Sequence, residues 1–478
     1  MPAGKRIQLL GKPLRRLVRA LARRRITARN SRAYRVLLAG LSAERSVDGS
    51  DALRPRVLAI GSWSFPVYSQ SFVYQELASL LEAGFDLRLA YTDEGIPEAL
   101  PPQCSALATA ALRLPAERPI TRRDLAHFRR TRPAAVARLL ALLAQASGRS
   151  AQELVADGRV LRAFSLARIA EVWKADLVHS YFFYEGSLAA FVVQQLLELP
   201  RAVTCYSDHL LDDDSLKLVS LQLARADLVV ATSERVRREL LALAPACASR
   251  LLVKPNAVDG RFYAPRVRPE PEGGAPFRLL SVARIDPKKG LQDLLTAAAE
   301  LRRRGIPFAL ELVGGVEPAS EAGERELAAL RAEIERLDLG GVVALRGFLP
   351  AEGVRAALGT AHLFVAPYVE TAGGDKDGIP TALLEAMATG LAVVAARSGS
   401  IPEVITDGGD GRLVPPGSPT ALAAAIAELL AAPGERERLG AAAARTVRER
   451  FVLEVCEPAL ARRMDALVES RRRRTSPA

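Results

Sequence analysis

The sequence has few of the residues that hold metals or form crosslinks. Its 478 residues include 4 cysteines and 4 histidines. The cysteines lie far apart, with no CxxC spacing, at Cys104, Cys205, Cys247 and Cys456. This pattern argues against a zinc site and indicates a reducing compartment. No apolar run approaches the roughly 18 to 20 residues that a membrane span requires.

Acidic residues are absent from the start of the chain. Glu44 is the first acid, and 12 Lys and Arg residues precede it. Subtracting these 12 from the total of 66 leaves 54, which equals the number of Asp and Glu. The net charge of +12 therefore belongs to the residues that precede Glu44, and the remaining chain is neutral. The body gives no electrostatic reason to expect nucleic acid binding.

The arm, residues 1–50, combines this charge with an apolar stripe. Leu14, Leu17, Val18 and Leu21 are spaced at i, i+3, i+4 and i+7 among arginines. A helix of this kind suits an anionic membrane surface, here through residues 5–35; a disordered basic tail and a nucleic acid contact are the alternatives. The arm lacks the uninterrupted apolar core and the clear cleavage site of a secretory signal, so we do not expect one. We therefore expect a cytoplasmic protein, peripheral on the inner leaflet of the plasma membrane.

Two segments alternate short apolar runs with amphipathic stretches, which predicts two doubly wound α/β domains facing a central cleft. The N-terminal domain spans 55–256, with strands expected at 56–61, 86–92, 175–181, 201–207, 226–233 and 250–255 and helices at 70–84, 186–198 and 233–243. Residues 115–172 interrupt it with a helical insertion rich in Arg and Leu.

A Pro- and Gly-rich stretch, 259–277, predicts a linker to the second domain. That domain spans 277–450, with strands expected near 277–284, 308–313, 341–346, 363–367 and 391–396. A C-terminal helix and basic tail, 451–478, complete the chain.

The stretch DGIPTALLEAMATG, residues 377–390, places a carboxylate where a helix usually buries an apolar side chain. A glycine-bearing loop leads into a helix beginning at Pro380 or Thr381, and such a helix N-terminus binds anions, a diphosphate above all. Glu385, one turn inside, could accept hydrogen bonds from a vicinal diol such as ribose. A solvent-facing helix after an ordinary loop is the alternative.

A second cluster, VARIDPKKG at 282–290, places Arg284 and Lys289 across a tight turn after a strand. Both cations could neutralise a diphosphate leaving group, although an ordinary charged loop has the same composition. In LVGG, 312–315, Gly314 would let a flat ring approach the backbone. The stretch is not the GxGxxG fingerprint of dinucleotide-binding folds.

Together these motifs resemble the retaining glycosyltransferases of family 4, which have the GT-B fold. Asp377 and Glu385 match the family's E-x7-E motif, and the stretches 398–417 and 253–263 are similar to two further family motifs. The sequence DGIPTALLEAMA and the stretch 65–84 resemble sequences of the family branch that builds exopolysaccharides of the colanic acid type.

The resemblance implies a role for each residue. Glu385 would hold the nucleotide ribose, Asp377 the donor sugar, and Arg284 with Lys289 the diphosphate. Backbone groups of Gly378, Ile379, Pro380 and Thr381 would contact the phosphates.

Two positions depart from the family pattern. Asp377 replaces the usual glutamate, and Tyr206 stands where the family has a histidine. His209, beside Asp208, is the candidate replacement for that imidazole, a structural histidine being the alternative.

LLDDDS, 210–215, contains the D-x-D of metal-dependent glycosyltransferases, but its position after a strand favours helix capping. We predict no metal and no cofactor, because the cationic pair offers an alternative to Mg²⁺.

The predicted function is transfer of a sugar from a nucleotide diphosphate sugar to a saccharide hydroxyl, with retention, in surface or exopolysaccharide assembly. The acceptor would lie against Ser69, Phe72 and Tyr206. If the arm lies on the membrane, we expect the acceptor to be a lipid-linked saccharide. A nucleotide-sugar epimerase of the same fold and a non-catalytic donor-binding scaffold are the alternatives.

Overall fold

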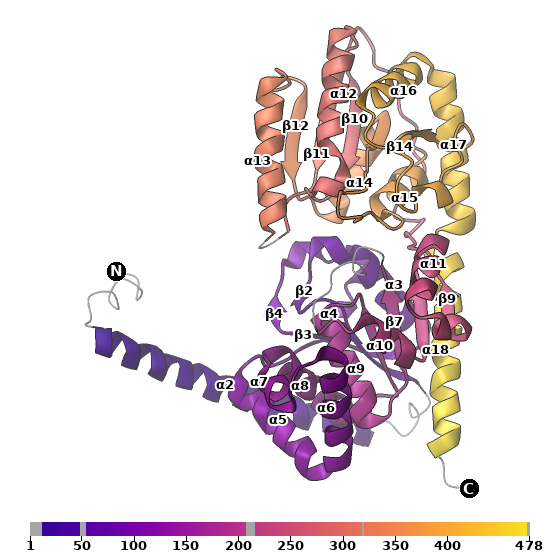
Figure 1. Cartoon of the computed structure of the whole chain (residues 1–478). Coiled ribbons are helices and arrows are strands. Elements are labelled where there is room, and N and C mark those ends of the chain that lie inside the picture. Colours follow the sequence, from indigo (N-terminus) through magenta and orange to yellow (C-terminus); the bar gives the residue numbers. More distant parts are fainter. Residues whose placement is uncertain (1–11, 48–53, 207–215, 318–319, 476–478) are drawn as a thin grey trace.

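The computed structural model describes residues 12–47, 54–206, 216–317 and 320–475. It consists of two domains, each built on a parallel sheet and arranged one above the other in Figure 1. Within the described ranges, no helix has both the length and the apolarity needed to cross a bilayer.

The N-terminal domain has a seven-stranded sheet in the order β5-β3-β1-β6-β7-β8-β9. Its strands are β1 (Arg56–Ile60), β3 (Asp86–Tyr91), β5 (Ala111–Arg113), β6 (Leu177–Tyr181), β7 (Arg201–Cys205), β8 (Leu228–Ala231) and β9 (Leu251–Val253). A separate pair joins β2 (Ser64–Phe65) to β4 (Asp93–Glu94). Strands β6, β7 and β8 are buried at every position, because helices cover both faces of the sheet. All six strands expected here are confirmed.

Helices of this domain connect successive strands. They are α3 (Ser71–Glu82), α4 (Leu107–Ala110), α9 (Glu185–Leu197), α10 (Val219–Arg225) and α11 (Glu234–Leu243). The segment predicted as a helical insertion contains α5 (Arg118–Thr131), α6 (Pro133–Ser147), α7 (Ala151–Ala156) and α8 (Gly158–Trp173). Phe164 and Trp173 of α8 are fully buried in the same core as α9. The last helix of the insertion is therefore the crossover helix of the sheet; α5 and α7 pack on it, and α6 packs on α9.

The C-terminal domain has a six-stranded parallel sheet in the order β12-β11-β10-β13-β14-β15. Its strands are β10 (Phe277–Val282), β11 (Phe308–Val313), β12 (Val343–Gly347), β13 (Leu363–Ala366), β14 (Val393–Ala396) and β15 (Arg412–Val414). Its helices are α12 (Leu291–Arg303), α13 (Glu321–Arg336), α14 (Ala351–Thr360), α15 (Thr381–Ala388), α16 (Pro419–Ala431) and α17 (Pro433–Arg450). Five of these strands were expected, and β15 was not.

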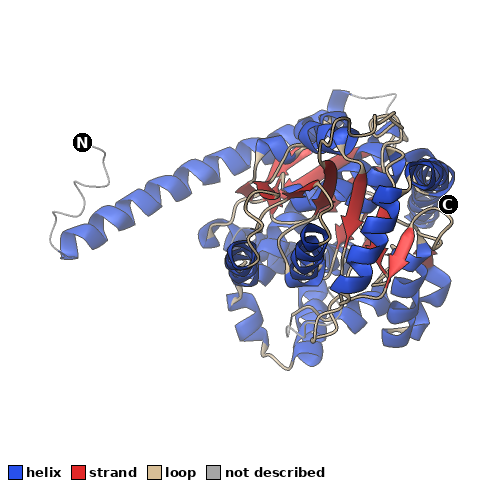
Figure 2. Ribbon diagram, turned by 90° about the horizontal axis from the view of Figure 1, so that it is seen from above, coloured by secondary structure: helices blue, strands red, loops and turns tan. Residues whose placement is uncertain are grey.

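The N-terminal helix α2 (Lys12–Val47) belongs partly to the N-terminal domain. Figure 2 shows its first half extending away from the body. Tyr34 and Leu41, in its second half, are buried in the core that α8 forms. The Tyr34 hydroxyl donates a hydrogen bond to Asp124 Oδ2 at 3.1 Å. The predicted arm, 1–50, is thus an integral part of the domain over its second half.

The C-terminal helix α18 (Leu453–Thr475) leaves the C-terminal domain and runs down along the N-terminal domain (Figure 1, yellow). Leu460, Met464 and Val468 are buried in the core of that domain, together with side chains of β1 and β3. Near its end, Arg472 Nη2 lies 2.7 Å from Asp176 Oδ2.

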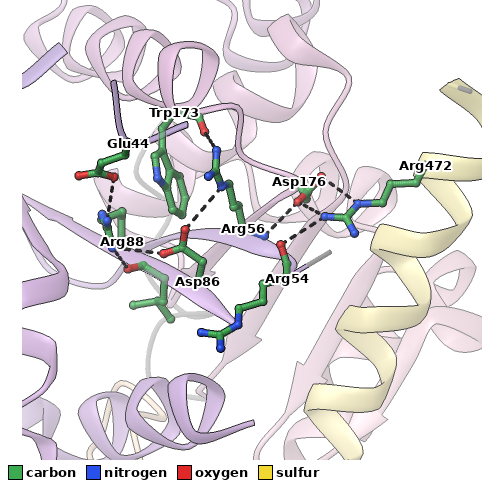
Figure 3. A network of polar contacts seen from close by, with 9 residues as sticks. Glu44, Arg54, Arg56, Asp86, Arg88, Trp173, Asp176 and Arg472 are labelled. Carbon is green, nitrogen blue, oxygen red and sulfur yellow. Dashed lines mark hydrogen bonds and ion pairs between the residues drawn. The ribbon is translucent and has the colours of Figure 1, made fainter. Parts of the chain in front are cut away.

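Figure 3 shows that Asp176 lies in a polar network at one edge of the N-terminal sheet. The backbone N–H of Arg56, at the start of β1, donates to the same Asp176 oxygen at 3.0 Å. Arg88 of β3 reaches Glu44 of α2 at 2.9 Å. Both terminal helices are therefore anchored at the edge where the strands begin, away from their carboxyl ends.

The chain crosses between the domains at two adjacent places. Val258, in the first crossing, donates its N–H to Phe451 O at 2.9 Å, and Leu453 donates to Val258 O at 3.2 Å. Beside them, Lys254 Nζ forms buried ion pairs with Glu76 of α3 at 2.8 Å and with Glu457 of α18 at 2.7 Å. The hinge is thus a pair of hydrogen-bonded segments.

Candidate functional site

A cavity of about 310 Å³ opens between the two domains and is lined by residues of both. Its volume lies within the range of small-molecule sites. Every predicted site residue except His209 lines it: Ser69, Phe72, Tyr206, Arg284, Lys289, Gly314, Asp377, Gly378, Ile379, Pro380, Thr381 and Glu385. His209 and the D-x-D stretch 210–215 lie outside the described residues. The remaining predicted residues, although scattered in the sequence, thus share one space.

Helix α15 directs its N-terminus into this cavity. The helix begins at Thr381, and the residue before it, Pro380, is extended and makes no side-chain capping hydrogen bond. Gly378, Ile379, Pro380 and Thr381 line the cavity beside it. Backbone N–H groups and the positive end of the helix dipole therefore meet the cavity, which is the arrangement that binds phosphate groups.

Glu385 lies one turn further along α15 and is 7% exposed. Burial raises the pKa of its carboxyl group to about 7, and a hydrogen bond with the hydroxyl of Tyr263 acts in the opposite direction. Tyr263 is itself buried and lines the cavity from the linker between the domains. Among the described side chains, the hydroxyl of Tyr263 stabilises the charged form of this carboxyl group. Because Glu385 lines the cavity, its carboxyl group can also accept hydrogen bonds from a ligand.

Lys289 and Asp377 form an ion pair on the wall of the cavity, with Nζ and Oδ2 separated by 2.5 Å. The ammonium group also lies 4.4 Å from the centre of the Tyr368 ring. Burial lowers the pKa of Lys289, the Asp377 carboxylate opposes this, and Arg284 lowers it further through like charge. Lys288 Nζ lies 3.9 Å from the other oxygen of Asp377. Lys288 Nζ also lies 3.2 Å from Asp375 Oδ2, so the two lysines are paired with two carboxylates, and Arg284 adds a further positive charge to this wall.

Two glycines let the backbone approach closely at this wall. Gly314 has a φ of +130°, and a Cβ there would lie 1.9 Å from the carbonyl oxygen of Ala283. Gly399 has a φ of +56°, and its Cβ would lie 2.1 Å from the carbonyl oxygen of Asp377. Both positions therefore require glycine. Gly314 lines the cavity, and the close approach of a ligand's flat ring to its backbone stays a prediction.

Residues from the N-terminal domain and the hinge hold the loop before α15. Arg235 of α11 donates from Nη2 to the carbonyl oxygen of Asp377 at 2.7 Å. Asn256 of the hinge donates from Nδ2 to the carbonyl oxygen of Ile379 at 3.0 Å. Sequence reasoning did not assign these two residues or Tyr263. Asn256 and Tyr263 lie in the stretch 253–263, whose likeness to a family motif was the available signal.

The opposite wall is aromatic. Phe72 and Tyr206, both predicted on the acceptor side, have ring centres 4.9 Å apart, and Phe182 lies 4.7 Å from Tyr206. Phe182 has a φ of +61°, a left-handed backbone that bulky residues rarely adopt. Across the cavity, the ring of Tyr68 stacks on Phe348 of the C-terminal domain at 4.8 Å. Flat apolar faces of this kind pack well against sugar rings.

Comparison with known families assigns both domains. Residues 153–261 match the family model described as Glycosyltransferase Family 4, and residues 267–446 match Glycosyl transferases group 1. Each match falls within one of the two domains that the structure shows.

Curated relatives match part of the chain. The amylovoran biosynthesis glycosyltransferase AmsK of Erwinia amylovora is 32% identical over 262 residues, 53% of this chain and 61% of AmsK. The WcaL protein of Escherichia coli K12, whose name associates it with colanic acid biosynthesis, is 37% identical over 178 residues, 37% of this chain and 41% of WcaL. The chain thus spans from about two fifths to three fifths of the length of these relatives.

Solved structures share the fold over nearly the whole chain. A sucrose-phosphate synthase from Thermosynechococcus elongatus has a TM-score of 0.67 at 19% identity, covering 88% of this chain and all of that one. Anabaena HepE, solved in complex with UDP, has a TM-score of 0.64 at 15% identity, covering 86% of this chain and all of that one. Each domain therefore matches a glycosyltransferase family model, Glycosyltransferase Family 4 in the first domain and Glycosyl transferases group 1 in the second, and the two facing Rossmann-like domains have the GT-B fold.

Proposed function

We propose that this chain is a retaining glycosyltransferase that transfers a sugar from a nucleotide diphosphate sugar to a hydroxyl group of a saccharide, in the assembly of a surface polysaccharide or exopolysaccharide. The observation that carries the proposal is the wall formed by Arg284, Lys289 and the N-terminus of α15, with Glu385 one turn beyond. The names of AmsK and WcaL support the polysaccharide context.

Each group on this wall has a part in holding the donor. Arg284, Lys289 and the backbone of 378–381 would bind the diphosphate, and the Glu385 carboxyl group would accept hydrogen bonds from the ribose hydroxyls. Asp377, held by Lys289 in the free enzyme, would contact the donor sugar. These cations would stabilise the leaving diphosphate, so the proposed reaction uses neither a metal ion nor a cofactor.

The proposed mechanism is attack on the same face of the sugar from which the diphosphate leaves. The donor phosphate accepts the proton of the acceptor hydroxyl as the glycosidic bond breaks, and the new bond keeps the anomeric configuration. The protein contributes positioning and stabilisation of the leaving group. The acceptor would lie against Ser69, Phe72 and Tyr206 on the opposite wall, and His209 would stand near it.

The basic first half of α2 favours a lipid-linked acceptor. We propose that residues 5–35 lie on the anionic cytoplasmic face of the membrane through their basic residues. Because Tyr34 and Leu41 pack in the domain, the test deletes only residues 1–25. Binding of the shortened and full chains to phosphatidylserine vesicles should then differ at least tenfold, and equal binding would contradict the membrane role.

The enzymatic proposal is tested by thermal shift with UDP-, GDP- and ADP-sugars. One donor should raise the melting temperature of the wild type and of Glu370→Ala, an exposed change in the loop before α15, but not that of Glu385→Ala. Retention is then read from the anomeric configuration of the product by NMR, where a new glycosidic bond also distinguishes transfer from epimerisation. No shift with any donor, or an equal shift in all three proteins, would contradict the donor site.

A further inference from the structure

A second cavity, of about 470 Å³, lies beside the first and has no part in the donor site. Helix α3 forms one side, with Ala78, Ser79 and Glu82, and the first turns of α18 form the other. Asp259 and Arg261 of the linker lie at its rim. It is thus enclosed by the N-terminal domain, the hinge and the C-terminal helix together.

Three side chains of its wall carry buried polar atoms that lack a hydrogen-bond partner among the described residues. They are Gln75 Oε1, both amide atoms of Gln103, and Glu457 Oε2. Gln75 is only 2% exposed and Glu457 6% exposed. An unsatisfied buried polar atom costs about 1 to 3 kcal/mol, so several around one cavity indicate a missing polar partner.

The chemistry of these atoms selects the partner. Gln103 offers a donor and an acceptor, whereas Gln75 and Glu457 offer acceptor oxygens. Each of these atoms can pair with a hydroxyl group, which both donates and accepts, so a molecule with several hydroxyl groups can satisfy them together. The charged residues of the wall are Glu82, Asp259, Glu454 and Glu457 against Arg261 and Arg462, an acidic excess that disfavours an anion. The partner expected is a neutral molecule rich in hydroxyl groups.

The two cavities share part of their wall. Gln75, on the second turn of α3, and Gln103 line both of them. Just before Gln75 on the same helix, Phe72 lines the aromatic side of the first cavity. A chain of sugar rings entering beside Phe72 would therefore meet the second cavity at these two glutamines.

We propose that the second cavity is a saccharide subsite, which binds neutral sugar units of the acceptor away from the hydroxyl group that reacts. This rests on the proposed function, because it places the body of the acceptor chain whose end lies in the first cavity. Gln75 and Gln103 would hydrogen-bond the sugar unit between the two cavities, and Glu457 a unit beyond it.

The test measures binding of neutral trisaccharides, maltotriose, mannotriose and 2′-fucosyllactose, by titration followed with ligand-observed NMR. Trigalacturonate serves as the anionic comparison. At least one neutral trisaccharide should bind the wild type and the control Gln152→Leu, an exposed glutamine on α7. Gln103→Leu and the cavity-filling Ala461→Trp should each weaken that binding about tenfold or more, the loss expected for one or two hydrogen bonds.

Stability separates a binding role from a structural one. Because neither amide atom of Gln103 has a hydrogen-bond partner among the residues that the structure describes, Gln103→Leu should leave the unliganded melting temperature unchanged or raise it. A lower melting temperature would show that Gln103 already has a structural partner, which contradicts the proposal.

The outcomes also separate the subsite from the donor site, because UDP and GDP binding are measured on the same proteins. Nucleotide binding without trisaccharide binding, or trisaccharide binding that survives both substitutions, overturns the subsite and leaves the proposed function standing. Preferential binding of trigalacturonate overturns the neutral class. Trisaccharide binding without nucleotide binding supports the cavity as a saccharide site and contradicts the proposed donor.

Discussion

Glu385 is a carboxylic acid among buried apolar neighbours, Leu384, Ala386 and Met387. Burial raises its pKa from the ordinary 4.5 to about 7. Between these two values the folded protein holds a proton that the unfolded chain has released. Ionisation of the Glu385 carboxyl group therefore destabilises the folded state. The free energy of unfolding falls for this reason as the pH rises from 4.5 through 7.

Replacing Glu385 by Gln should remove that pH dependence. The difference in the free energy of unfolding between the wild type and Glu385→Gln should change by about 2 to 3 kcal/mol between pH 4.5 and 8.5, with the variant relatively more stable at the higher pH. Urea denaturation of the unliganded proteins at several pH values measures it. The exposed substitution Glu352→Gln is the control, and parallel curves for Glu385→Gln and the wild type would contradict the prediction.

Part of the candidate site could be predicted from local sequence patterns. The sequence of 377–390 was sufficient to place Glu385 and the N-terminus of α15 in one cavity, because both lie on a single short helix after a strand. Tyr263 and Arg235 were missed because Tyr263 reaches Glu385 from the linker and Arg235 reaches the loop before α15 from the other domain. Their contribution depends on how the domains sit together, which no local pattern encodes.

At the scale of elements, α18 joins the C-terminal domain to the core of the other one. We expect Met464→Ala to destabilise the N-terminal domain by about 2 to 5 kcal/mol, because it leaves a cavity beside β1 and β3. The tryptophans Trp63 and Trp173 both lie in that domain, so their fluorescence during urea denaturation measures it.

Val455→Ala on the same helix is the matched control. Val455 is 50% exposed, and its loss should change the free energy of unfolding by no more than about 0.5 kcal/mol. Equal effects of the two substitutions would show that α18 is not part of the N-terminal core.

Elements were predictable where the chain itself carries a strong pattern. All eleven expected strands are present, because each is an apolar run bounded by polar or turn residues. The missed strands β2, β4, β5 and β15 have two or three residues each, and β5 and β15 obtain their conformation from pairing at a sheet edge. The packing partners of α2 and α18 could not be predicted either. An apolar stripe shows that one face of a helix is covered, but it does not identify the element that covers it.

At the scale of the whole molecule, polar contacts hold the domains together beside the cavity. Glu403 accepts hydrogen bonds from the N–H groups of Glu234 and Arg235, both at 2.8 Å. Ser233 Oγ lies 2.8 Å from Ser400 Oγ. Arg235 also donates a hydrogen bond to the carbonyl oxygen of Asp377, so the first turn of α11 fixes both the domain contact and the loop before α15.

Arg235→Ala should therefore lower kcat/KM for the donor about tenfold, because the loop carrying Asp377 loses one charge-assisted hydrogen bond. Most of the loss should lie in the KM of the donor. Arg238→Ala, exposed on the same helix, is the control. An unchanged kcat/KM in Arg235→Ala would show that the loop keeps its conformation without this contact.

The two adjacent crossings between the domains have a consequence for how the chain can be divided. A protease that cleaves the linker near Gly273 would cut only one of the two connections. The second piece would still carry α18, whose apolar face lies in the core of the first piece and whose Glu457 pairs with Lys254 there. Cleavage would therefore yield a two-chain protein that elutes as one, and the halves could be produced separately and reassembled by mixing.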